Sequence, residues 1–107
     1  MPQQPMIYYA VTQGRGEHWD ARRSMREQEQ WDEHARFMDA LVDDGFIVLG
    51  GPLDDGEKVL LIFNAESRQA IEARLAGDPW MPMGIRRIAQ VERWEILLAQ
   101  KRAEESA

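Results

Sequence analysis

The chain has 107 residues, of which 44% are hydrophobic and 30% charged, and it contains no cysteine. This size and composition predict one domain over residues 1–107, and they exclude disulfides and cysteine-ligated zinc. Nineteen acidic against thirteen basic side chains give a net charge of -6, which argues against nucleic-acid binding, since that needs a cationic surface. No apolar run approaches a membrane span and no secretory signal precedes the first strand, so we expect a cytoplasmic protein without a membrane partner.

The first half of the chain predicts a strand, a loop and a helix. Residues 6–12 are rich in aromatic and β-branched side chains, which favour a strand. Residues 13–23 carry two glycines and many charges, which predicts a loop. Ser24 and Glu27 have the spacing of a capping box that opens a helix. We expect this helix to run to about Asp44, with Gly45 as its stop.

The second half predicts two further strands, a helix and a final strand. A strand over 46–49 ends at a Gly-Gly-Pro segment, and an Asp-Gly turn leads to a strand over 58–63. A helix over 66–76 has Asn64 or Ser67 as its cap and Gly77 as its stop. Two prolines make residues 78–84 a loop. A long last strand over 85–98, with room for a bulge, completes a core of about 6–98 and leaves residues 99–107 as a polar tail.

This order predicts an α+β fold of the ferredoxin-like βαββαβ type, with a four-stranded antiparallel sheet and two helices on one of its faces. The predicted strands are apolar on both sides, whereas a sheet with one solvated face alternates apolar and polar residues. We therefore expect a homodimer through the helix-free face, a dimeric α/β barrel. The alternative is that some of these apolar residues are simply exposed.

His34 falls inside the apolar stripe of the first predicted helix, between the positions of Phe37 and Met38 on a helical wheel. One interpretation is a core histidine with a satisfied hydrogen bond. The other is an imidazole held in a dry cleft as a general acid or base. Asp78, before Pro79, has two interpretations as well. Its carboxylate bonds nearby backbone in a turn, or it pairs with His34 and orients the ring.

Other side chains are candidates for binding a substrate. Arg26 precedes the first helix, where a guanidinium is either solvated or grips a carboxylate or phenolate. Trp80, beside Asp78, and Trp31 are aromatic side chains that either belong to the core or stack on a substrate ring. Gly51 and Pro52 end a strand and let the chain turn, or let a ligand approach the backbone. With only two histidines, His18 and His34, and no cysteine, we expect no metal site and no cofactor.

Several segments taken in order resemble the YCII-related (YciI-like) family. They are the run from Trp31 to Leu41, the Gly-Gly-Pro segment, Asp78-Pro79-Trp80, and the close from Val91 to Leu98. The resemblance implies a dimeric α/β barrel and a His–Asp pair in a cleft, which is proposed as catalytic in that family. On this chain the pair corresponds to His34 and Asp78.

Together these observations predict a small cofactor-free enzyme. His34 and Asp78 would carry out general acid–base chemistry, of the lyase, isomerase or hydrolase type, on a small molecule such as an aromatic or enolisable one. A non-catalytic dimer that binds a small ligand in the same pocket, or regulates through it, is the alternative. A purely structural His–Asp pair is the third interpretation.

Overall fold

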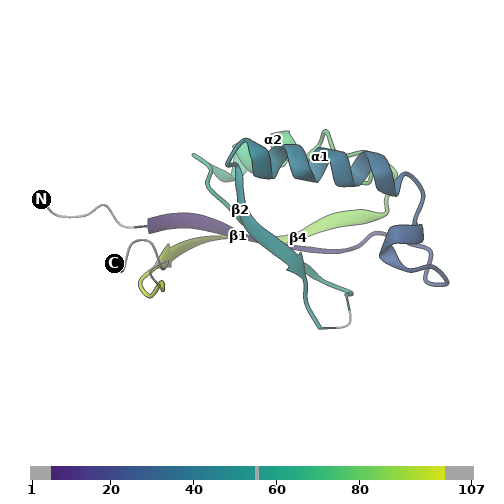
Figure 1. The fold of residues 1–107 in the computed structure, drawn as a ribbon, viewed down its shortest axis with the longest axis horizontal. Helices are drawn as coiled ribbons and strands as arrows, with labels where there is room; N and C mark the ends of the chain where they lie inside the picture. The colour runs from purple at the N-terminus through teal and green to yellow at the C-terminus, as the bar shows by residue number, and fades with distance from the viewer. Residues whose placement is uncertain (1–5, 55, 101–107) are drawn as a thin grey trace, which may run out of the picture.

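The computed structural model describes residues 6–54 and 56–100. Their elements are β1 (Met6–Arg15), a 3-10 turn η1 (Met25–Glu27), α1 (Trp31–Asp43), β2 (Ile47–Pro52), β3 (Val59–Phe63), α2 (Arg68–Leu75) and β4 (Arg86–Ile96). The four strands form one antiparallel sheet in the order β2-β3-β1-β4. Both helices lie over the same face of this sheet (Figure 1). The predicted ferredoxin-like α+β fold is confirmed.

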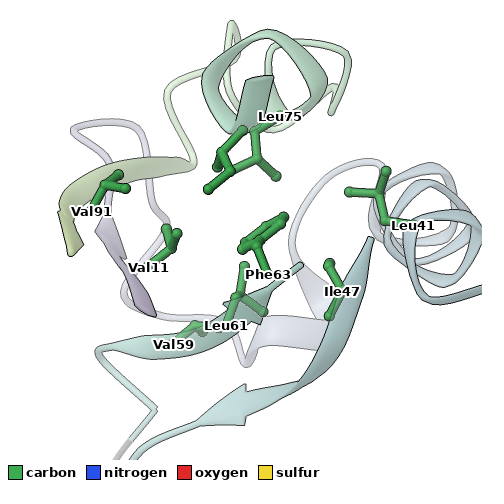
Figure 2. Packing of buried hydrophobic residues seen from close by; sticks show 9 residues of the cluster. Val11, Leu41, Ile47, Val59, Leu61, Phe63, Leu75 and Val91 are labelled. Carbon is green, nitrogen blue, oxygen red and sulfur yellow. The ribbon is translucent and has the colours of Figure 1, made fainter. Parts of the chain in front are cut away.

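The core lies between that face and the helices. Val11 of β1 pairs with Leu61 of β3 on one side and with Val91 of β4 on the other, which aligns three apolar side chains across the sheet. Figure 2 shows Phe63 at the centre of the cluster, where side chains from both helices meet those of the strands. Val11 and Phe63 have no exposed surface at all.

The two strands beside the candidate site are longer than predicted. β1 continues to Arg15, where the sequence predicted a loop from residue 13. β4 carries a bulge opposite the step from Thr12 to Gln13, where the register of the two strands shifts. Beyond the bulge β4 continues to pair with Gly14 and Arg15, and this pairing extends β1. The last strand was predicted to have room for a bulge, and the bulge is present. β2 likewise continues to Pro52, three residues beyond the predicted end.

The prediction of one helix from Ser24 was wrong. The Ser24 N–H does donate to Glu27 Oε1, at 2.9 Å, but the capping box closes only the short turn η1. The chain then becomes extended at Gln28 and left-handed at Gln30, with φ of 56°, and α1 starts at Trp31. Gln28 causes the break, because its buried side chain donates to the Asp20 carbonyl at 2.8 Å and accepts from the Asp20 N–H at 3.0 Å.

Glycine is required where the chain leaves β1. The Gly16 N–H donates to the Ile85 carbonyl at 2.8 Å, and a Cβ on Gly16 would lie 2.0 Å from the Gly84 carbonyl oxygen. Any side chain would push these two backbones apart. The loop after β1 is thereby fixed against the start of β4.

The remaining predictions concern the second helix, the chain end and membranes. Ser67 is the cap of α2, since its side chain accepts from the Ala70 N–H at 3.1 Å. Residues 101–107 of the predicted polar tail lie outside the described residues. Neither helix of the described part has the length and apolar character needed to cross a bilayer.

Replacing Phe63 by alanine tests the core. We expect Phe63→Ala to lower the free energy of unfolding by about 3–5 kcal/mol, because it empties the centre of the cluster. Leu53→Ala, in the turn between β2 and β3, is the control and should change stability by less than about 0.5 kcal/mol. Urea denaturation at a fixed protein concentration measures both. Equal losses for the two variants would contradict the packing described here.

Candidate active site

His34 and Asp78 are in direct contact, although 44 residues separate them. His34 lies in the first turn of α1, and Asp78 follows the end of α2. His34 Nδ1 lies 2.8 Å from Asp78 Oδ2 and 2.9 Å from Oδ1. The two residues are 8% and 0% exposed, so this contact is shielded from solvent on the side of the carboxylate.

Asp78 is also bound by its own loop. Its Oδ1 accepts the Trp80 N–H at 3.0 Å, and its own N–H donates to the Leu75 carbonyl at 3.0 Å. The sequence left two interpretations of Asp78 open, a turn-forming carboxylate and a partner for His34, and both are correct. The turn fixes the carboxylate, and the carboxylate faces the imidazole.

Trp80 fixes the plane of the imidazole. Its ring stacks on that of His34, with centroids 3.8 Å apart and planes 7° from parallel. Its Nε1–H donates to the Glu29 carbonyl at 2.6 Å, just before α1 begins. Trp80 is fully buried, so its ring covers the face of the His34 imidazole that is turned toward the protein interior.

A pocket of about 260 Å³ opens beside the His–Asp pair. His34, Trp31, Gly51 and Pro52 line it, which places four of the predicted site residues around one cavity. The rest of its wall is mainly apolar, with side chains from α1 and the sheet that include Met38, Val42, Ile47, Val59 and Leu61. Its size is suited to a small organic molecule.

Two predicted binding residues are not among those that line this pocket. Trp80 is separated from it by the His34 ring that it supports. Arg26 is exposed on η1, with its guanidinium carbon 5.9 Å from the centre of the Trp31 ring. Arg26 thus lies near the ring of Trp31, which does line the pocket.

Three polar lining residues were missed by sequence reasoning, Gln13 of β1, Asp39 of α1 and Arg86 of β4. Gln13 was assigned to a loop, and the face on which Arg86 lies depends on the bulge in β4, whose position no sequence pattern marks. Burial lowers the pKa of the Arg86 guanidinium below its usual value, and the nearby charge of Arg15 lowers it further.

His18 lies apart from the pair. Its Nδ1 is 3.1 Å from the Met83 carbonyl oxygen, and its side chain is exposed. Within residues 6–54 and 56–100, no three histidine, aspartate or glutamate side chains are grouped as metal ligands would be.

Among solved structures the chain is similar to 5-chloro-2-hydroxyhydroquinone dehydrochlorinase (TftG) from Burkholderia phenoliruptrix AC1100, in complex with 2,5-dihydroxybenzoquinone. The identity is 20% and the TM-score 0.49, with 88% of this chain and 96% of that chain covered. No curated protein matches. The family model of the YCII-related domain matches residues 6–95, and the chain therefore belongs to the YCII-related domain family.

Proposed function

We propose that this protein is a small enzyme in which His34 and Asp78 carry out general acid–base chemistry, without a cofactor, on a small aromatic or enolisable molecule. The observation that supports it best is the contact of 2.8 Å between His34 Nδ1 and the buried Asp78 carboxylate, made in the wall of a mainly apolar pocket. With Nδ1 engaged, Nε2 is the ring nitrogen left to act on a bound molecule.

The chemistry follows from the two ring nitrogens. Asp78 accepts a hydrogen bond from Nδ1–H, so the proton of the neutral ring stays on Nδ1 and the Nε2 lone pair is available as a base. A proton taken from a C–H or O–H group of the substrate moves to Nε2, and the positive charge that forms on the ring is stabilised by the carboxylate. The same proton can then be returned to another atom, as isomerisation and elimination require. Such assistance contributes about 10²–10⁴ in rate.

The packing around the imidazole suits this role. Stacking on Trp80 and the bond to Asp78 restrain both the plane and the direction of the ring. A base held in one orientation loses little entropy when it meets its substrate. Trp31, whose ring centre is 5.7 Å from that of His34, offers an aromatic surface beside the imidazole.

The protonation of His34 can be tested without a substrate. We expect the neutral ring to carry its proton on Nδ1, because a neutral Nδ1 lone pair would face the Asp78 carboxylate at 2.8 Å. Long-range ¹H–¹⁵N correlation spectra at alkaline pH distinguish the two tautomers. A neutral His34 with its proton on Nε2 would contradict the proposed base.

Proton exchange tests the activity without knowledge of the full reaction. Small enolisable ketones and phenols would be incubated with the protein in D₂O, and the loss of ¹H signals from carbon would be followed by NMR. We expect His34→Gln to slow any catalysed exchange by about 10²–10⁴-fold, since the base is removed. Asp78→Asn should also slow it, because the ring loses its orienting anion.

His18→Gln is the matched control, because it removes the other histidine, which lies outside the pocket lining. It should leave the exchange rate unchanged. Compounds that raise the melting temperature but show no exchange or turnover would instead support a binding module. Equal activity of the wild type and His34→Gln would rule out His34 as the base.

We further propose that two copies pack through the face of the sheet opposite the helices. Leu49 pairs with Ile62, and Ile62 pairs with Ala10, so these apolar residues form a row on that face. Leu49 and Trp94 are 62% and 43% exposed in the single chain. Exposed apolar side chains on a sheet face that no helix covers are typical of an interface, and a second copy of the chain offers a matching surface.

Sedimentation velocity tests this dimer. Leu49→Lys combined with Trp94→Lys should shift the protein toward the monomer, because two charges would be desolvated in the interface. Leu53→Lys, in the turn after β2, adds a charge at a side chain of similar exposure and should leave the assembly unchanged. A wild-type protein that sediments as a monomer at all concentrations would contradict the proposed dimer.

A further inference from the structure

The inner part of the pocket has a polar end built by the sheet. Gln13 of β1 pairs with Ile88 of β4, and Arg86 lies two residues before Ile88. Gln13 and Arg86 are therefore diagonal neighbours on one face of the sheet, within reach of long side chains. They are only 1% and 2% exposed, and both line the pocket whose other wall carries His34.

Arg86 is a buried cation, and the groups that its guanidinium contacts within residues 6–54 and 56–100 are neutral. Its Nη1 donates to the Glu57 carbonyl at 3.2 Å, its Nη2 lies 3.6 Å from Met25 Sδ, and its guanidinium carbon is 4.7 Å from the centre of the Trp19 ring. No carboxylate of residues 6–54 or 56–100 forms an ion pair with it. A buried charge held only by neutral groups is costly, and an anion reaching it would be bound strongly.

Gln13 adds a second donor beside this cation. Its Nε2 is buried and has no acceptor among the described residues. Buried polar groups nearly always have a partner, so an unpaired donor in a pocket wall indicates where a ligand oxygen would lie. The charge of Arg86 and the donor of Gln13 call for the same kind of group, an oxygen that carries negative charge.

We propose that this pocket takes a small organic anion, whose carboxylate or phenolate oxygen is bound by Arg86 and Gln13. The inference deepens the function proposed above by naming the charge of the substrate for the same site. Asp39, the acidic side chain among the lining residues, is exposed on α1. Its repulsion directs the anionic end away from α1 and toward the sheet.

The test compares ligands of equal shape and different charge. Benzoate is matched by benzamide, and 4-nitrophenolate by 4-nitroaniline, so that the two pairs distinguish a carboxylate from a phenolate. Titrations of ¹⁵N-labelled protein would follow the Gln13 side-chain amide and the Arg86 Nε–H signals. We expect the anion of at least one pair to bind about tenfold to a hundredfold more tightly than its neutral partner, with shifts of both signals.

Variants test whether the preference for anionic ligands depends on Arg86 and Gln13. Arg86→Gln should abolish it, whereas Arg87→Gln, at the exposed neighbour on the same strand, should retain it. Gln13→Glu places a carboxylate beside Arg86. It should abolish the binding of both anions and raise the melting temperature, because the buried cation gains a counter-ion. If Arg86→Gln does not fold, Gln13→Glu and the matched ligands still decide.

The outcomes separate this inference from the proposed enzyme. Equal affinities within both pairs, no binding of any probe, or an unchanged preference in Gln13→Glu would overturn the anion site. A clear anion preference without proton exchange on any compound would retain the anion site and remove the enzyme. Proton exchange that depends on His34, without tighter binding of the anions, would retain the proposed enzyme and remove the anion site.

Discussion

The burial of the Asp78 carboxylate is the constraint on which the site depends. A carboxylate with no exposed surface needs polar partners, and its partners come from two parts of the chain. The Trp80 N–H comes from its own loop, and His34 Nδ1 comes from α1. Satisfying this one side chain therefore joins the end of α2 to the start of α1.

The contacts of Trp80 follow from this junction between α1 and the loop after α2. Once the loop after α2 is held against α1, Trp80 stacks on His34 and reaches the Glu29 carbonyl. The start of α1 is then fixed by a side chain from the opposite half of the sequence. The imidazole is held on one face by Trp80 and at Nδ1 by Asp78, and His34 is one of the residues that line the pocket.

Local patterns in the sequence were enough for most of the fold, and together with the family resemblance they predicted the His–Asp pair. The apolar stripe around His34 and the Asp-Pro step at Asp78 marked both residues, and the family resemblance joined them. Arg86 could not be found in this way, because the bulge in β4 decides which face its side chain occupies. The break before Trp31 was equally hidden, since it depends on Gln28 binding the backbone of Asp20, a tertiary contact.

The loop from residue 17 to residue 30 brings Met25 into the pocket and is tied down at both of its ends. Gly16 holds one end against Ile85, and Glu29 holds the other against Trp80. Neither tie uses the residues in the middle of the loop. A substitution at Met25, between the two ties, would therefore change the shape of the pocket while both ends of the loop stay held in place.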